Sequence, residues 1–280
     1  MTTTSLLITG ASGTIGRELV KALRARRAEF AVMSSKPAPG AVLGDFADLA
    51  SLARAFAGVQ TLFLLFPLAP NSFELARNAV EAAKAAGVKH IVRSSGAGAE
   101  AGSPVAIADL QGRIDALVEA SGIPYTLLRP NGFMQNWVTF YSAQLKAGVY
   151  AAPHGTAGIS VVDVRDIAEA AAAVLLNPAA HVGRAYTLTG GEALSTAEQV
   201  AAIAGATGRA IRYEDIPEAQ AEAQLRAWGL PDVMVGYFMS LNHVYKQGWA
   251  AGVSPDLQTL NGHAPRRFAD FAAEHAAAWQ

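Results

Sequence analysis

Short apolar runs alternate with amphipathic helical stretches over the first 130 residues of the chain. We interpret residues 5–9, 29–33, 41–43, 60–66, 90–94 and 125–129 as strands, and residues 14–27, 49–56, 72–86 and 106–120 as helices. The strands are rich in Val, Ile, Leu and Phe without strict polar alternation, which indicates burial on both faces of a parallel sheet. The alternation of elements predicts right-handed β-α-β crossovers and a doubly wound α/β fold.

The pattern loosens after residue 130. We expect a strand at 159–164, a helix at 164–176, a strand at 185–188 and helices at 195–207 and 217–228. Residues 133–145 and 231–252 are rich in bulky apolar and aromatic side chains. These features predict a sheet domain over residues 1–150 and a smaller C-terminal α/β lobe over 151–280, interleaved with the sheet domain.

Composition narrows the class of protein. The chain has 280 residues, of which 51% are hydrophobic and 16% charged, and its net charge of −1 argues against a nucleic-acid partner. The absence of cysteine excludes disulfides and thiolate metal sites, and the six histidines show no metal-type spacing, so we expect no metal. The apolar runs at 62–70 and 168–176 are too short to span a bilayer. We therefore expect a cytoplasmic protein without a membrane partner, as a monomer or a homodimer.

The first strand is followed by a glycine-rich turn and then by a helix. Gly10, Gly13 and Gly16 are spaced three residues apart, and the helical pattern starts at Thr14. Glycines let the backbone approach an anion, and a helix N-terminus offers unpaired N–H groups with partial positive charge. The turn therefore predicts a dinucleotide-binding site, to which Ser12 and Ile15 also belong.

The residues after the second strand indicate which dinucleotide binds. Ser34, Ser35 and Lys36 stand where a protein that selects NAD usually places an acidic residue for the ribose hydroxyls. Two hydroxyls and a lysine suit a 2′-phosphate, so we expect NADP(H) in preference to NAD(H). The alternative is that these three residues form an ordinary polar turn.

Further candidate cofactor residues follow the next three strands. They are Asp45 and Phe46 for the adenine, Phe66 and Pro67 for the ribose and nicotinamide, and Ser94, Ser95 and Gly96 for the nicotinamide end. This assignment follows from the rule that ligands of such sheets lie at the carboxyl ends of the strands. The alternative for Asp45 is that it caps the helix that starts nearby.

Four motifs together resemble those of a known family. They are TGASGTIG, LGDFAD, AAKAAGVKHIVRSSGAG and SGIPYTLLRPNGFMQN. The chain is similar along nearly its whole length to the NmrA-like atypical short-chain dehydrogenases, in particular to members of the quinone oxidoreductase and triphenylmethane reductase type. The resemblance implies an NADP(H)-binding Rossmann domain, a small C-terminal lobe and a planar or aromatic hydride acceptor.

The sequence lacks the Tyr-x-x-x-Lys pair of typical short-chain dehydrogenases, because no tyrosine has a lysine four residues later. By register with the SGIPYTLLRP motif, Gln111 and Asp115 occupy the equivalent positions. Gln111 can hydrogen-bond a substrate oxygen but is not a useful general acid, and Ser94 is the other group expected to orient that oxygen. We interpret Asp115 as a solvated residue of the helix face, with a catalytic role as the alternative.

Asn131, Phe133, Met134 and Trp137 follow the sixth strand and are the candidate substrate residues. Phe133, Met134 and Trp137 could form an apolar wall for an aromatic acceptor, and Asn131 could orient a carbonyl. The alternatives are that the three apolar residues only pack the two lobes together, and that Asn131, which precedes a glycine, forms a turn. The sequence predicts an NADPH-dependent oxidoreductase that transfers hydride to a quinone-like or other conjugated acceptor. The alternative function is a non-catalytic NADP(H)-binding redox sensor or regulator of the NmrA type.

Overall fold

The computed structural model describes residues 5–280, which form two compact units. Unit 1 comprises the residues up to Pro104 together with Ala108–Arg129 and Ile167–Tyr186. Unit 2 comprises Val105–Ile107, Pro130–Asp166 and Thr187–Gln280. The chain passes between the units several times, and a division of folding domains at residue 150 stays a prediction.

Unit 1 is built on a seven-stranded sheet in the order β3-β2-β1-β4-β5-β6-β9. Its strands are β1 (Leu6–Ile8), β2 (Ala31–Ser34), β3 (Ala41–Leu43), β4 (Thr61–Leu64), β5 (His90–Ser94), β6 (Tyr125–Pro130) and β9 (Arg184–Leu188). The strands β1 to β6 pair in parallel, and the chain order reverses between β1 and β4. The predicted doubly wound parallel sheet is therefore confirmed, with its switch point after β1 and β4.

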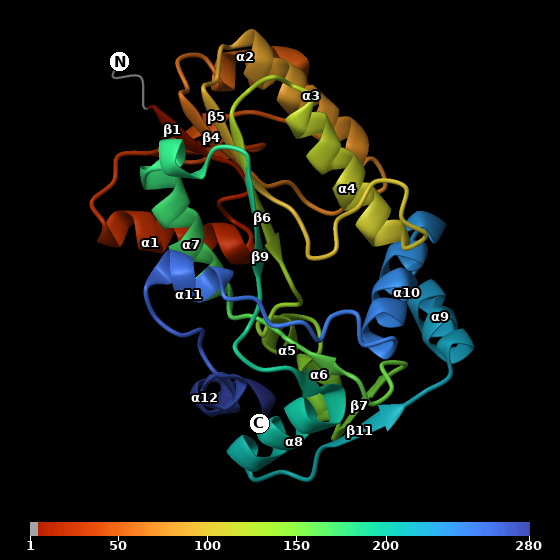
Figure 1. Cartoon of the computed structure of the whole chain (residues 1–280). Coiled ribbons are helices and arrows are strands. Elements are labelled where there is room, and N and C mark those ends of the chain that lie inside the picture. Colours follow the sequence, from red (N-terminus) through yellow and green to blue (C-terminus); the bar gives the residue numbers. More distant parts are fainter. Residues whose placement is uncertain (1–4) are drawn as a thin grey trace. The chain divides into compact units, whose positions relative to one another are not determined.

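Helices cover both faces of this sheet. They are α1 (Thr14–Ala25), α2 (Leu49–Ala55), α3 (Ser72–Ala85), α4 (Ala106–Glu119), α7 (Val164–Leu176) and the short 3₁₀ helix η1 (Pro178–His181). Helices α2, α3 and α4 lie on one face, and α1 and α7 lie on the other (Figure 1). Gly87 and Gly122 follow α3 and α4 with φ angles of +73° and +77°, the left-handed conformation that glycine commonly adopts just past a helix end.

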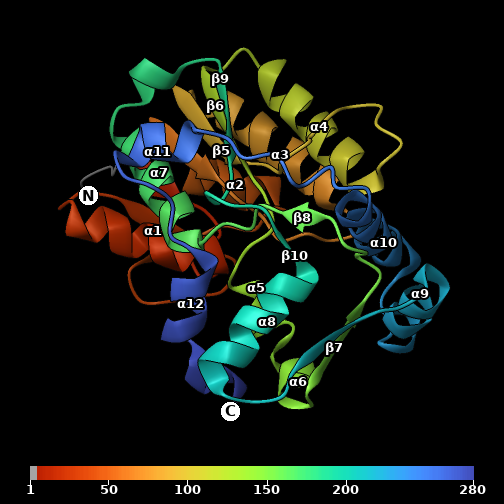
Figure 2. The same cartoon turned by 60° about the horizontal axis from the view of Figure 1, so that its bottom comes forward.

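Unit 2 has two small sheets and a set of helices (Figure 2). The strand β7 (Val149–Ala152) pairs in parallel with β11 (Arg212–Asp215), and β8 (Gly158–Ile159) pairs antiparallel with β10 (Leu194–Ser195). The helices are α5 (Asn136–Thr139), α6 (Ser142–Lys146), α8 (Thr196–Thr207), α9 (Glu218–Ala227), α10 (Asp232–Lys246), α11 (Asp256–Asn261), α12 (Phe268–Glu274) and η2 (Ala276–Trp279). Trp137, Tyr150, Phe268, Phe271 and Trp279 are buried together in its core.

The strand expected at residues 159–164 is largely absent. Only Gly158–Ile159 is a strand, and the following backbone bonds to two separate loops: Ser160 N donates to Ala250 O at 3.0 Å, and Val162 N donates to Gly132 O at 2.8 Å. An apolar run can be buried without being a strand when loops satisfy its backbone groups.

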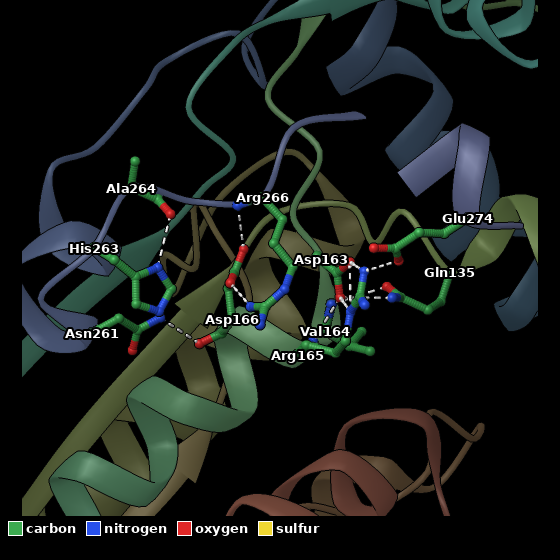
Figure 3. Close-up of polar contacts among 10 residues, drawn as sticks. All are labelled: Gln135, Asp163, Val164, Arg165, Asp166, Asn261, His263, Ala264, Arg266 and Glu274. Atoms are coloured by element: carbon green, nitrogen blue, oxygen red, sulfur yellow. Dashed lines mark hydrogen bonds and ion pairs between the residues drawn. The ribbon is translucent and has the colours of Figure 1, made fainter. Parts of the chain in front are cut away.

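A buried carboxylate organises the start of α7 in unit 2 (Figure 3). Asp163 accepts hydrogen bonds from Gln135 Nε2 and from Arg165 N, each at 2.8 Å, and Gln135 Oε1 accepts from Val164 N at 2.9 Å. Arg165 also pairs with Glu274 at 2.7 Å. Burial acts to raise the pKa of Asp163, but the hydrogen bonds with Arg165 and Gln135 outweigh it and hold that pKa below its ordinary value.

The neighbouring carboxylate of Asp166 anchors the C-terminal segment of unit 2 (Figure 3). It accepts from Arg266 N at 2.8 Å and forms an ion pair with the Arg266 guanidinium, and Asn261 Nδ2 donates to the Asp166 carbonyl at 3.0 Å. Burial raises the pKa of Asp166, with Arg266 opposing that rise.

Over residues 5–280, no helix has the length and apolar character needed to cross a membrane.

Candidate functional site

The turn between β1 and α1 is shaped by its glycines. Gly10 has a φ of +65°, which side-chain-bearing residues rarely adopt. A Cβ on Gly16 would lie 2.1 Å from Gly10 O and 2.7 Å from Ala11 Cα, so only glycine lets α1 begin this close to the turn. Gly13 is the N-cap of α1, no side chain caps the helix, and its first turn has no acidic residue. This N-terminus therefore fits a pyrophosphate.

The other predicted residues of the turn differ in which of their groups a ligand could reach. Ser12 is exposed and Thr14 is half-buried, so their hydroxyls are accessible. Ile15 is buried in the core of unit 1, so only its backbone N–H is available to a ligand.

Thr9 joins the two strands at the switch point and was not predicted from the sequence. Its Oγ1 lies 2.9 Å from Phe63 O, accepts from Leu65 N at 2.9 Å, and is fully buried. This hydroxyl fixes the ends of β1 and β4 next to each other, so Thr9 positions the glycine turn. The only sequence signal was a polar residue at the end of an apolar run.

Ser34, the first of the three polar residues at the end of β2, forms hydrogen bonds within the turn. Ser34 Oγ donates to Lys36 O at 2.6 Å and accepts from Lys36 N at 3.2 Å, so the turn interpretation holds for Ser34. Ser35 and Lys36 are exposed, and no carboxylate among residues 5–280 pairs with Lys36. Their contact with a 2′-phosphate stays a prediction.

Asp45, the first of the two adenine candidates, forms a hydrogen bond within its own turn. Asp48, and not Asp45, caps α2 by accepting from Ala50 N at 2.9 Å, so the alternative role of Asp45 as a helix cap is wrong. Asp45 Oδ1 instead accepts from Ala47 N at 2.9 Å.

The rings of Phe46 and Phe66 pack edge to face, with centroids 5.9 Å apart. Pro67 follows them and is exposed. The structure thus brings Phe46 and Phe66 together at the carboxyl end of the sheet, where they can border a bound nucleotide.

The segment after β5 lies against the helix that carries Gln111. A Cβ on Gly96 would lie 3.5 Å from Gln111 Cγ. Ser94 is buried, and Ser95 Oγ is buried without a hydrogen-bond partner among the described residues. A buried hydroxyl without a partner is uncommon in folded proteins, and a bound ligand would satisfy it. Unit 1 therefore brings Gly96 close to Gln111, and the roles of Ser94, Ser95 and Gly96 at the nicotinamide stay predictions.

Asp115 is buried, so its interpretation as a solvated residue is wrong. Its side chain is 3% exposed and lies between two guanidinium groups. Arg93 pairs with Asp115 Oδ1, and Arg129 Nη2 lies 2.9 Å from Asp115 Oδ2. The helix face is polar at this position because Asp115 neutralises the buried Arg93 and also pairs with the partly exposed Arg129.

Arg93, which was also not predicted, connects this ion pair to Gln111. Its side chain is fully buried in β5, and its Nη2 donates to Gln111 Oε1 at 2.6 Å. Burial, and after it the charge of Arg129, lowers the pKa of Arg93 to about 9, so the guanidinium is protonated at neutral pH. A charged residue inside a strand buried on both faces was the sequence signal for a hidden carboxylate partner.

Two of the candidate substrate residues have structural roles in unit 2. Asn131 Nδ2 lies 2.8 Å from Ser160 Oγ and donates to Ala250 O at 2.9 Å, while its Oδ1 accepts from Gly132 N at 2.9 Å. Met134 is 1% exposed in the core. We therefore assign Asn131 and Met134 to the packing of unit 2.

Phe133 and Trp137 line a small pocket inside unit 2. Its volume of about 20 Å³ is enough for a water molecule or two. Tyr150 and Tyr245 also line it, and burial raises the pKa of both phenols, so the pocket presents neutral hydroxyls. His154, which lines it as well, is kept neutral because burial lowers its pKa to about 4.

The sequence and the fold are similar to those of known proteins. The sequence matches the NmrA-like family over residues 2–259. It is 35% identical over 283 residues to the NAD(P)H azoreductase of Xenophilus azovorans, covering 98% of this chain and 99% of that protein. It is also 35% identical over 287 residues to the (4-alkanoyl-5-oxo-2,5-dihydrofuran-3-yl)methyl phosphate reductase of Streptomyces griseus, covering 98% and 99%.

A solved structure is also similar to this chain over nearly its whole length. The NADPH-dependent quinone oxidoreductase QOR2 of Escherichia coli, complexed with NADPH, superposes with a TM-score of 0.86 and 29% identity over 96% of this chain and 99% of that one. Sequence and structure agree over nearly the full length of the chain, and the protein belongs to the NmrA-like family.

Proposed function

We propose that the protein transfers hydride from NADPH to a quinone-like or other conjugated small molecule. Two relatives that are each 35% identical over nearly the whole chain are an NAD(P)H azoreductase and a furanone phosphate reductase. These relatives show that the protein is an NAD(P)H-dependent oxidoreductase. The structural neighbour named above is an NADPH-dependent quinone oxidoreductase, which supports the choice of acceptor.

The observation that carries the proposal is the amide at position 111. Typical short-chain dehydrogenases have a proton donor there, whereas Gln111 can only hydrogen-bond, and it is held by Arg93 at 2.6 Å. Losing a positioned general acid costs a ketone reductase on the order of a hundredfold in rate. A quinone or a conjugated carbonyl tolerates that loss because it is electrophilic and its product takes a proton from water.

The residues of unit 1 fit the dinucleotide. The uncapped N-terminus of α1 would bind the pyrophosphate, Phe46 and Phe66 would border the adenosine part, and Ser95 Oγ would donate near the nicotinamide. When bound, NADPH supplies the hydride. Lys36 is exposed, without a carboxylate partner among the described residues, which supports the choice of NADPH over NADH. Trp137 is 4% exposed in the core of unit 2, which favours packing over a contact with the acceptor, and an acceptor contact of the half-buried Phe133 stays a prediction.

The second candidate function is a redox sensor that binds NADP(H) without turnover, which the missing Tyr-x-x-x-Lys pair favours. One assay separates the two. The purified protein is tested for NADPH oxidation with a panel of quinones, azo dyes and enones, and the affinities for NADP⁺ and NADPH are measured in parallel. Turnover with at least one acceptor class supports the enzyme. No turnover above background, with clear discrimination between NADP⁺ and NADPH, supports the sensor.

A further inference from the structure

The orientation of the Gln111 carboxamide is fixed by its partner. Arg93 donates to it at 2.6 Å, and a guanidinium has five N–H donors and no acceptor. Only the carboxamide oxygen can therefore face Arg93, and Nε2 must point away from it. Among residues 5–280, no acceptor hydrogen-bonds Gln111 Nε2, and the Gln111 side chain is half-buried. Gln111 thus presents a free N–H donor.

Arg93 is itself held in place by the buried ion pair. Asp115 accepts from Arg93 through one oxygen and from Arg129 through the other, at 3.0 Å from Arg129 Nε. The cluster contains two guanidiniums and one carboxylate, so it carries a net charge of +1 next to Gln111. Arg93 Nε is buried without a partner among the described residues, which makes the arrangement costly in stability terms.

This charge matters for the acceptor. A quinone that receives a hydride becomes the hydroquinone monoanion, and its negatively charged oxygen then takes a proton from water. A fixed N–H donor next to a net positive charge stabilises such an oxygen, because the donor needs no reorganisation as the negative charge develops.

We propose that Arg93 is a positioning residue that turns Gln111 into a fixed hydrogen-bond donor for the acceptor oxygen on which negative charge develops. The preferred acceptors are then those that carry such an oxygen, quinones and conjugated carbonyls. The inference rests on the proposed function, and its test compares two acceptor classes: a benzoquinone, which gains an oxyanion, and the triarylmethyl cation malachite green, which accepts hydride at carbon and becomes neutral.

The Gln111 variants test the donor. Gln111→Met should lower kcat with the benzoquinone by about a hundredfold, the usual effect of removing such a donor, and change kcat with malachite green by less than about threefold. Gln111→Glu keeps an oxygen for Arg93 but has no N–H, so it should lose the quinone rate equally while its unfolding temperature stays at or above that of the unaltered protein. Equal losses with both acceptors would overturn the inference.

The Arg93 variants test positioning. Arg93→Met should lower the quinone rate about tenfold, and Arg93→Met/Gln111→Met should be no slower than Gln111→Met alone, since Arg93 acts through Gln111. Multiplying losses would indicate a structural role and contradict the inference. Arg113→Met is the matched control: it removes an exposed guanidinium from the same helix, α4, and should leave both rates unchanged. If Arg93→Met does not fold, the two Gln111 variants decide.

A binding measurement gives a readout that does not depend on turnover. The probe is 4-nitrophenolate, an oxyanion on an aromatic ring, titrated into the protein saturated with NADP⁺. Gln111→Met should bind it about tenfold more weakly, and unchanged affinity would overturn the inference even where malachite green is not reduced. An unaltered protein that reduces neither acceptor would instead overturn the proposed function, and with it this role of Arg93.

Discussion

Replacing Asp115 by Asn distinguishes a buried ion pair from a solvated helix face. The carboxylate is 3% exposed and pairs with Arg93, which is fully buried, and with Arg129. Asn has the same shape but no charge, so the Arg93 guanidinium would be left buried with only Arg129 and neutral groups around it. Breaking a buried pair in this way costs about 3–5 kcal/mol, whereas a change on a solvated face stays within about 0.5 kcal/mol.

Urea unfolding followed by circular dichroism measures this difference. Asp109→Asn is the matched control on α4, because its pair with Arg113 spans 3.7 Å between partly exposed groups and contributes about 0.3–0.5 kcal/mol. The double variant Arg93→Met/Asp115→Leu should lose less than Asp115→Asn, since it removes both buried charges and leaves Arg129, 27% exposed, to solvent. A loss below about 1 kcal/mol for Asp115→Asn would refute the burial argument.

Three further changes test other parts of the molecule. Gly16→Ala places a Cβ 2.1 Å from Gly10 O and should cost about 1–3 kcal/mol and weaken NADPH binding in a fluorescence titration, whereas Gly205→Ala, with open space around its Cβ, should not. Lys36→Ala should weaken NADPH about fivefold, the equivalent of about 1 kcal/mol for an exposed charge pair, and leave NADH unchanged; equal effects on both would contradict the 2′-phosphate assignment. Burial lowers the pKa of His154 to about 4, against about 6.5 when unfolded, so the unfolded chain binds an extra proton between these values and stability should fall by about 3 kcal/mol from pH 7 to pH 4. A His154→Gln variant should lose that slope in urea unfolding, and an unchanged slope would show that other groups cause it.

The parts that the sequence predicted well are local. The strand expected at residues 90–94 is β5, and the glycine turn lies between β1 and α1 as expected. Both follow from patterns within about 20 residues: runs of apolar residues buried on both faces, and a turn whose backbone only glycine can adopt. Gly96 and Gln111, 15 residues apart in the same β-α unit, also lie close together.

The parts that were missed depend on distant partners. Asp115 is 22 residues from Arg93 and 14 from Arg129. An aspartate in a helix is expected to face solvent unless its partners are known, and the sequence does not show that these two arginines lie beside it. The sequence left open whether Asn131 orients the acceptor or forms a turn, and it gave no sign that the Asn131 amide donates to Ala250 O, 119 residues further along the chain. Periodicity contains no information on such pairs, because it reports only which face an element buries.

The buried cluster bears on the choice between enzyme and sensor. Replacing a buried ion pair with well-packed apolar residues is often neutral or stabilising, so stability alone does not explain a buried Arg93 whose Nε has no partner among the described residues. Local arrangements that cost stability are expected at functional sites. The variant Arg93→Met/Asp115→Leu separates the two functions: an enzyme should keep its affinity for NADPH and lose most of its quinone rate, because Gln111 is then free to turn its oxygen toward the acceptor. A sensor has no quinone rate to lose, and its affinity for NADPH should stay unchanged.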